Sequence, residues 1–279
     1  MDFRKFAKLI LIEQTLFTLP FAYLGILFAG GAGLYTWIWV TVALTAARTA
    51  GMSFNRVIDA DIDAKNPRTK DRLVPRGEVS PKIVWITGII SSFILILSSY
   101  MLNMLCFYLS FPAVILLLTY SYFKRFSSSS HFYLGFVEAA APIGGYLAVT
   151  AEFHPLPFLL GAVIMSWIAG LDIVYALQDA DFDKAEGLFS IPVKFGKRKA
   201  LLLSAACYII SLGILAAAGY TASMGWPFRI AFVCVMFIFI YQQYVARSGD
   251  INISIKQYFK ANMLISPVLF IGTFIDVYF

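Results

Sequence analysis

The segment NRVIDADIDAKNPRTKDR, residues 55–72, joins two long apolar runs and carries four aspartates and five basic side chains. This density of charge is unusual in a chain of 279 residues that is 60% hydrophobic and only 14% charged, because soluble domains carry about 25% charged residues. A chain of this length has too little interior to hide so much apolar surface from water, so the bilayer is the expected solvent. The segment is then a loop at one membrane face.

The apolar runs predict an all-α, polytopic membrane protein with a single transmembrane domain, residues 1–279. Each run is about 20 residues long, which is the length that a helix needs to cross a bilayer. None shows the ten-residue alternation of a membrane barrel. The nine expected spans lie near 9–29, 35–57, 82–102, 104–123, 132–150, 156–177, 200–220, 227–246 and 257–278.

Basic residues follow the connectors on one side of these spans. Connectors 30–33 and 151–155 contain no Lys or Arg, whereas 58–82 and 178–199 are rich in them. The positive-inside rule therefore places the N-terminus and both charged loops in the cytoplasm, and the C-terminus outside. We expect a prokaryotic cytoplasmic (inner) membrane, because no import signal precedes the first span. The net charge of +6 reflects these loops, and no nucleic-acid partner is expected.

Two clusters of acids repeat at a fixed distance. Asn55, Asp59 and Asp63 are spaced i, i+4, i+8, and a helix through them would place all three on one ridge. Asp179 and Asp183 lie 120 residues after Asp59 and Asp63, again directly after a span. We therefore expect two similar four-helix halves plus a ninth helix, arranged around a central cavity.

Facing pairs of carboxylates are typical of sites for hard divalent cations. Mg²⁺ takes oxygen ligands and is usually held by one or two carboxylates together with substrate phosphates. The neighbouring bases Arg68, Lys70 and Arg72 could grip the remaining phosphate oxygens. Tyr120 and Lys124, spaced i, i+4 at a cytoplasmic helix end, add a second possible phosphate contact. The pattern indicates a diphosphate bound through metal.

Several polar residues lie inside the apolar spans and leave alternatives open. Asp172 is two helical turns deeper than Asp179 and is a functional candidate, since a carboxylate at that depth is costly. It could instead be a structural partner of Arg48. Glu138 either lines the cavity or pairs with Arg48, and the sequence does not choose. His131 and His154 share no motif, and we interpret both as structural.

Over its whole length the chain resembles the UbiA-type intramembrane prenyltransferases, which transfer isoprenoid chains from allylic diphosphates to aromatic acceptors. The motifs that carry the resemblance are N-x-x-x-D-x-x-x-D, D-x-x-x-D and Y-x-x-x-K, and two acid motifs at this separation are specific. Stretches such as LFTLPFAYLG are similar to the subset of 4-hydroxybenzoate and futalosine-route menaquinone polyprenyltransferases. The matching positions are Asn55, Asp59 and Asp63, then Asp179 and Asp183, and then Tyr120 and Lys124.

The resemblance implies a Mg²⁺-dependent enzyme of quinone biosynthesis, with a polyprenyl diphosphate donor, an aromatic acid acceptor and the lipid bilayer as partners. It implies that the five residues of the acid motifs hold the metal. Arg68 and Lys124 would neutralise the leaving group, and Asp172 and Tyr175 would orient the acceptor or help its proton leave. Many family members carry a basic residue in the cytoplasmic half of the first helix, where this chain has EQT, residues 13–15.

Two other classes of protein fit parts of the pattern. A secondary transporter of an organic anion would also combine a repeat with intramembrane charges. Its coupling sites would lie near the midplane, however, whereas these acids cluster at the cytoplasmic helix ends. A membrane phosphotransferase uses metal-binding aspartates within one helical stretch, and two distant clusters do not fit it. The sequence therefore favours the prenyltransferase.

Overall fold

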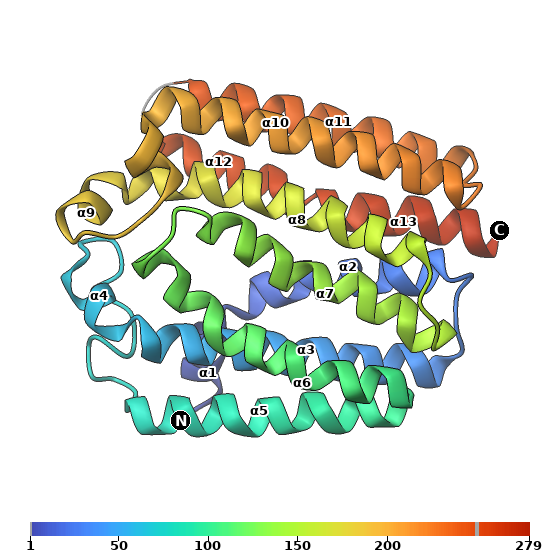
Figure 1. Ribbon diagram of the computed structural model, residues 1–279, viewed down its shortest axis with the longest axis horizontal. Coiled ribbons are helices and arrows are strands. Elements are labelled where there is room, and N and C mark those ends of the chain that lie inside the picture. The colour runs from blue at the N-terminus through green and yellow to red at the C-terminus, as the bar shows by residue number, and fades with distance from the viewer. Residues whose placement is uncertain (1, 249–250) are drawn as a thin grey trace.

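The structure is a computed structural model that describes residues 2–248 and 251–279, and all regular structure in these ranges is helical (Figure 1). In chain order the elements are α1 (Phe3–Ile10), α2 (Ile12–Phe28), α3 (Leu34–Ile58), α4 (Ala60–Lys65), α5 (Pro81–Leu102), α6 (Met104–Thr119), the 3₁₀ helix η1 (Tyr120–Arg125), α7 (Ser130–Thr150), α8 (Pro155–Tyr175), the 3₁₀ helix η2 (Ala176–Gln178), α9 (Ala180–Ala185), α10 (Ile191–Thr221), α11 (Trp226–Arg247), α12 (Ile251–Asn262) and α13 (Ile265–Tyr278).

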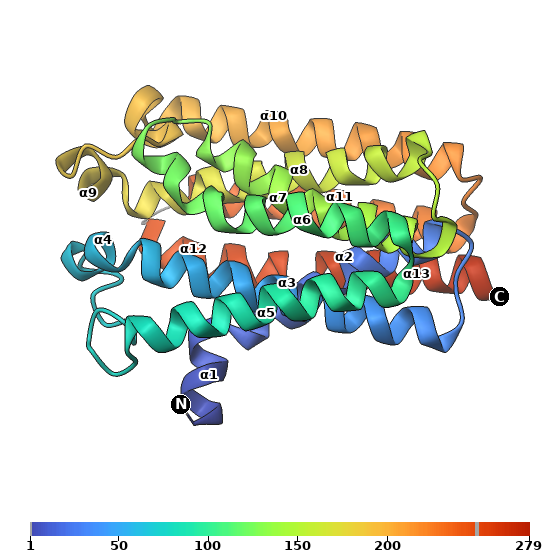
Figure 2. The same cartoon turned by 60° about the horizontal axis from the view of Figure 1, so that its bottom comes forward.

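The long helices run side by side along one axis of the molecule (Figures 1 and 2). Seven helices among the described residues are long and apolar enough to cross a membrane, and Phe17–Phe28 is a shorter apolar helix. The long helix α3 has 25 residues and turns polar towards its C-terminal end. The expectation of an all-helical, multi-pass membrane protein is confirmed, while the count of nine spans stays a prediction.

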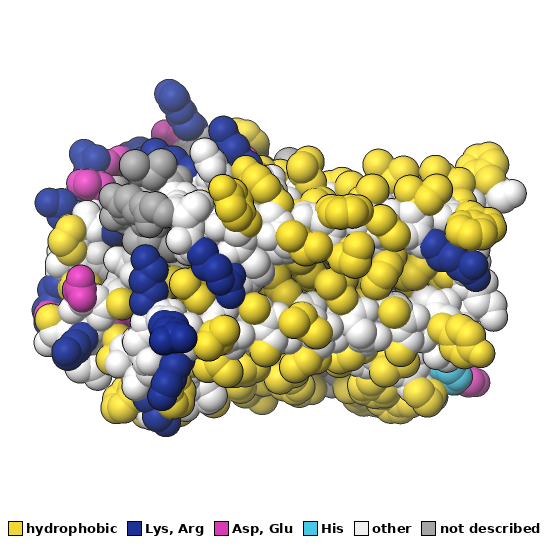
Figure 3. Space-filling model, turned by 90° about the horizontal axis from the view of Figure 1, so that it is seen from above, with side chains coloured by type: hydrophobic (Ala, Val, Ile, Leu, Met, Phe, Trp, Pro, Cys, Tyr) yellow, Lys and Arg dark blue, Asp and Glu magenta, His cyan; other side chains and the backbone are white. Residues whose placement is uncertain are grey.

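The surface divides into a charged end and an apolar band. Lys and Arg side chains gather at the end that carries α4 and α9, and hydrophobic side chains cover the middle of the molecule (Figure 3). Phe93 on α5 and Ile209 on α10 are 68% and 70% exposed. A contiguous apolar surface of this kind is stable against lipid tails rather than water.

Small residues bring α2 and α7 into close contact. A Cβ atom on Gly25 would lie 2.1 Å from the carbonyl oxygen of Pro142, and one on Gly145 would lie 2.0 Å from that of Ala22. Only glycine allows the two backbones to approach this closely, which is how membrane helices commonly associate. This contact fixes one wall of the interior.

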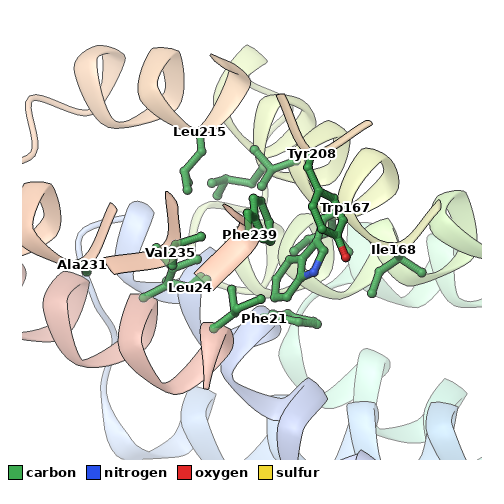
Figure 4. Close-up of a cluster of buried hydrophobic side chains, with 14 of the residues drawn as sticks. Phe21, Leu24, Trp167, Ile168, Tyr208, Leu215, Ala231, Val235 and Phe239 are labelled. Carbon is green, nitrogen blue, oxygen red and sulfur yellow. The ribbon is translucent and has the colours of Figure 1, made fainter. Parts of the chain in front are cut away.

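A cluster of large side chains joins α2 and α8 to the C-terminal half (Figure 4). Trp167 is 1% exposed, and Phe21 meets its ring edge-on at a centroid distance of 4.9 Å. The Trp167 indole N–H donates to Asn262 Oδ1 at 3.0 Å, so the polar atom of the ring is satisfied as burial requires. This packing leaves the interior next to α3 and α7 open as a cavity.

Several expected spans are interrupted in the structure. The first begins only at Ile12, because Leu11 adopts a left-handed conformation with φ 51°. Gly196 breaks α10 with φ 76°, shortly before the expected span near 200–220. The ninth span is split between α12 and α13. The first two breaks lie at or just before the start of an expected span, and the third lies within the ninth. All three leave the order of the elements as predicted.

Candidate functional site

A cavity of about 880 Å³ runs through the interior and opens among the charged loops. Its apolar wall comes mainly from α2, α3, α6, α7 and α8, while α4, η1 and α9 border its charged end. Ligand pockets commonly measure about 300–1,000 Å³. The predicted acid motifs both line this cavity.

The first acid motif spans a break between two helices. α3 ends at Ile58, Asp59 takes φ −94° and ψ 3°, and α4 begins at Ala60, so the motif is not one continuous helix. Asp59 and Asp63 are nevertheless both buried, at 2% and 4% exposure, while Asp61 is exposed. The predicted ridge is thus buried at Asp59 and Asp63, while Asp61 points to the exposed side.

The second motif repeats this local design. η2 ends at Gln178, Asp179 takes φ −102° and ψ 2°, and the six-residue helix α9 follows. α4 reads ADIDAK and α9 reads ADFDKA. The two breaks put Asp59 and Asp179 at equivalent turns at the same end of the molecule (Figure 1). The predicted convergence of the two motifs therefore holds in the fold.

Each of three carboxylates has its own cation. Lys124 Nζ lies 2.8 Å from Asp59 Oδ2, and Arg72 Nη1 lies 2.6 Å from Asp63 Oδ2. Arg68 forms the third pair, with Asp179: Nε donates to Oδ1 at 2.9 Å and Nη2 to Oδ2 at 2.5 Å. Three of the four basic residues expected from the sequence thus pair with the acid clusters.

The other predicted site residues differ in whether they line the cavity. Asn55 Nδ2 donates to Asp59 Oδ2 at 2.7 Å, and so orients that carboxylate. The Tyr120 hydroxyl donates to the Gly51 carbonyl at 3.2 Å and lies on the cavity wall. Lys70 is exposed and is not among the side chains that line the cavity. The structure brings together all the predicted diphosphate residues except Lys70.

Burial and charge set the carboxyl groups apart. Burial raises the pKa of Asp59, although Lys124 opposes the shift. Burial also tends to raise the pKa of Asp179. Hydrogen bonds from Arg68 and Asn66 outweigh this effect and hold the pKa of Asp179 below its usual value. For Asp183, burial and the neighbouring Asp179 raise the pKa to about 6. The second motif therefore pairs a strongly acidic carboxyl with a weakly acidic one.

Two contacts that the sequence did not predict tie the charged loops together. Asn66 Nδ2 donates to Asp179 Oδ1 at 3.0 Å, and its own Oδ1 accepts from the Arg68 backbone at 2.9 Å. Lys65 Nζ lies 2.6 Å from Glu186 Oε2. Both contacts join residues more than 100 positions apart, so only the run of polar residues after Asp63 hinted at them.

Asp172 has a partner that the sequence did not suggest. Asp172 Oδ2 lies 2.7 Å from His131 Nδ1, and the Ile191 backbone N–H donates to His131 Nε2 at 3.2 Å. Because Nε2 accepts, the proton of the neutral ring sits on Nδ1 and points at Asp172. His131 is 3% exposed and borders the cavity, as do Asp172 and Tyr175. The interpretation of His131 as merely structural therefore misses a contact with a cavity carboxylate.

The open choices for Arg48 and Glu138 are settled together. Arg48 Nη1 lies 2.5 Å from Glu138 Oε1, so Asp172 is not the partner of Arg48. Both residues also line the cavity. In the first spanning helix, Glu13 lines the cavity too, while the side chain of Gln14 falls outside the described residues. The pair Arg48–Glu138 is a neutralised ion pair deep in the wall.

The donor set fits a hard cation such as Mg²⁺. Asp59 Oδ1 is buried and accepts no hydrogen bond from the described groups, and Arg125 Nη2 is 3.7 Å away. An unpartnered carboxylate oxygen in an oxygen-rich pocket is the kind of ligand that Mg²⁺ takes. Among the residues that the structure describes, however, no three His, Cys, Asp or Glu side chains are grouped as one metal site. The ligands would therefore have to be completed by substrate oxygens or solvent.

The sequence is similar to a family of transferases. The model of the UbiA prenyltransferase family matches residues 18–264. The 4-hydroxybenzoate octaprenyltransferase of Cupriavidus metallidurans is 28% identical over 97% of this chain and 93% of its own length. The protein of the same name from Vibrio atlanticus is 29% identical over 82% of this chain and 80% of its own length.

Solved structures share the fold. The apo structure of a UbiA homologue from Aeropyrum pernix matches with a TM-score of 0.88 and 31% identity, and covers 95% of this chain and 98% of that chain. A UbiA homologue from Archaeoglobus fulgidus, solved with GPP and Mg²⁺ bound, matches with a TM-score of 0.73. It is 18% identical and covers 99% of this chain and 100% of that chain. At that identity the second match speaks for the fold alone.

Proposed function

The chain belongs to the UbiA prenyltransferase family, and on that premise we propose that it transfers a polyprenyl group from an allylic diphosphate to the ring of a hydroxylated aromatic acid. The acceptor is 4-hydroxybenzoate or a naphthoate-type acid, and the product is a precursor of a quinone. The observation that carries the proposal is the meeting of two buried aspartate motifs with separate cations at one end of a large apolar cavity.

The charged end of the cavity suits the diphosphate. Magnesium held by Asn55, Asp59, Asp63, Asp179 and Asp183 would supply Lewis-acid stabilisation of the diphosphate charge. Arg68, Arg72 and Lys124 present cationic N–H groups to the same space, with Tyr120 below them and Lys70 at the exposed rim. Guanidinium groups bind phosphate oxygens through paired hydrogen bonds, so these side chains receive the negative charge that grows as the diphosphate leaves.

The apolar part of the cavity suits the rest of the reaction. The allylic C–O bond breaks with its electron pair leaving on the diphosphate, and the ring carbon ortho to the hydroxyl bonds to the allylic carbon. Leu117, Ile168 and Phe259 are among the apolar side chains that line this space, and they exclude the water that would otherwise capture the cation. A long donor tail would have to leave through a lateral gap between helices into the bilayer.

Asp172 is placed to receive the proton that the ring loses. It borders the cavity, and His131 donates to one of its oxygens, which orients the carboxylate and leaves its other oxygen for the substrate. Tyr175 lies one turn further along α8, where its hydroxyl accepts from Arg68 Nη1 at 2.7 Å. Tyr175 thus connects the diphosphate end to the acceptor end.

The proposed orientation puts this chemistry on the cytoplasmic face of a prokaryotic cytoplasmic (inner) membrane. The basic side chains gather at the end with α4 and α9 (Figure 3), which favours the cytoplasm under the positive-inside rule. The charged groups of both substrates would then be bound at the cytoplasmic end of the cavity.

The test is a product assay on purified protein in lipid nanodiscs. Protein is supplied with Mg²⁺, geranyl diphosphate and a panel of hydroxybenzoates and hydroxynaphthoates, and products are identified by mass spectrometry. We expect one acceptor to gain the mass of a geranyl group, and the gain to disappear with EDTA. Hydrolysis of geranyl diphosphate with no prenylated acid from any panel member would refute an aromatic acid acceptor.

A further inference from the structure

Arg56 is a buried cation that the functional assignment above leaves without a task. It lies in the last turn of α3, is 6% exposed and lines the cavity. The three nearby cations Arg68, Arg72 and Lys124 each hold an aspartate. Within the described part of the chain the Arg56 guanidinium forms no ion pair and donates no hydrogen bond. A guanidinium in this position needs an anion, because burial of an uncompensated charge is costly.

The surroundings of Arg56 explain why the protein does not supply that anion. Asp63 and Arg72 are the charged groups that act on it, together with the phenols of Tyr120 and Tyr175. Arg72 already binds Asp63 Oδ2 at 2.6 Å, so Arg56 and Arg72 together carry two positive charges against the single negative charge of Asp63. The Tyr120 hydroxyl is turned to the Gly51 carbonyl and that of Tyr175 to Arg68. The excess positive charge therefore faces the cavity.

We propose that Arg56 binds an oxyanion of a substrate inside the cavity, through the paired N–H groups of its guanidinium. This inference rests on the proposed function, because both proposed substrates carry planar or tetrahedral oxyanions that match a guanidinium fork. The oxyanion is either the carboxylate of the aromatic acid or a phosphate oxygen of the prenyl donor. A carboxylate bound here would compensate for the lack of a basic residue at EQT in the first span.

Aromatic side chains line the same cavity as Arg56. The rings of Tyr175 and Phe259 meet edge-on at a centroid distance of 5.1 Å, and both residues line the cavity. A ring whose carboxylate is held at Arg56 would occupy the cavity that these side chains line. Asp172, the proposed proton acceptor, lies on the same helix as Tyr175, three residues earlier. Arg56 would thus fix one end of the acceptor while α8 contacts the other.

The test compares Arg56→Gln and Arg56→Lys with wild type and with Arg76→Gln. Arg76 is 53% exposed and pairs at the rim with Glu78 at 3.2 Å, so its substitution removes the same charge outside the cavity. Three constants are measured in nanodiscs: the KM for geranyl diphosphate, the KM for 4-hydroxybenzoate, and the Kd of inorganic pyrophosphate with Mg²⁺ by calorimetry. We expect Arg56→Gln to raise one KM by about tenfold or more, Arg56→Lys to have a smaller effect, and Arg76→Gln to have none.

The pattern of constants separates the two sources of the oxyanion. A raised acceptor KM with unchanged pyrophosphate affinity identifies the carboxylate, whereas weakened pyrophosphate binding identifies the donor. If folded Arg56→Gln keeps all three constants within twofold of wild type, the inference is overturned. Should that variant not fold, an Arg56→Lys protein that folds and keeps all three constants overturns it equally.

Failure of the proposed function gives a different result. In that case wild type forms no prenylated acid from the panel, so neither KM exists, but the pyrophosphate measurement still compares the variants. Arg56-dependent pyrophosphate binding then supports an oxyanion site independently of the acceptor. Pyrophosphate binding that does not depend on Arg56, in a protein without turnover on the panel, overturns the inference.

Discussion

Replacing Arg68 by lysine should weaken binding of the donor without unfolding the protein. Arg68 donates three hydrogen bonds, two to Asp179 and one to the Tyr175 hydroxyl, and its guanidinium carbon lies 4.9 Å from the centre of the Tyr175 ring. Lysine keeps the charge but can replace only one bond of this planar fork. Hydrogen bonds to charged groups contribute about 1.5–3 kcal/mol when sheltered.

The side chain is 31% exposed, so solvent screening reduces each lost bond to about 1 kcal/mol or less. Losing two bonds therefore costs about 1–2 kcal/mol, or about 5–30-fold in an equilibrium constant. In the proposed function the same N–H groups bind phosphate oxygens of the donor, so we expect Arg68→Lys to raise the KM for geranyl diphosphate by this factor at saturating acceptor and Mg²⁺. Arg76→Lys is the matched control at the exposed rim and should match wild type. An Arg68→Lys enzyme with a KM within twofold of wild type would refute the reasoning.

The remaining predictions address the metal ligands, pH and packing. Loss of a residue that only hydrogen-bonds to a metal ligand typically lowers activity about 10–100-fold. Asp59→Asn removes a proposed ligand itself and should lower kcat/KM by more than this. Asp61→Asn, on the exposed side, should stay near wild type in the same assay. With the pKa of Asp183 at about 6, its ionised fraction falls from about 90% at pH 7 to about 10% at pH 5. Because a ligand must be ionised, Mn²⁺ affinity measured with pyrophosphate should fall about tenfold over this range, and a flat profile contradicts it. Gly145→Ala would place a Cβ 2.0 Å from the Ala22 carbonyl oxygen and should destabilise the fold by about 1–3 kcal/mol. Gly144→Ala meets nothing within 4 Å and should leave the melting temperature in detergent unchanged.

The sequence was sufficient for the parts of the site that depend on spacing along a helix. Asp59 and Asp63 are buried and Asp61 is not, as the four-residue period requires. Tyr120 and Lys124 also line the cavity, although they lie in a 3₁₀ helix, in which residues three apart share a face. Composition alone indicated an all-helical membrane protein, because few other folds hide so many apolar residues. These features depend on residues close together in the sequence, so helix periodicity and composition are enough to predict them.

Contacts between distant helices could not be predicted in this way. His131 and Asp172 are 41 residues apart, and no motif in either segment predicts that the two side chains are in contact. Their pairing depends on how α7 packs against α8, which in turn depends on close approaches such as that of Gly135 to the backbone of Met165. The helix breaks at the two motifs were likewise invisible, because a short helix and its continuation share the same periodicity.

The internal repeat also explains an asymmetry of the site. Each half contributes an aspartate at a helix break and another four residues later, so the carboxylates are matched. The cations are not matched: the positions 120 residues after Arg68 and Arg72 are Leu188 and Pro192. Arg68 instead reaches across to Asp179 of the second motif. The carboxylates are therefore arranged symmetrically, whereas the positive charges come from the first half only. Such a site can hold the two ends of an unsymmetrical diphosphate ester in different electrostatic environments.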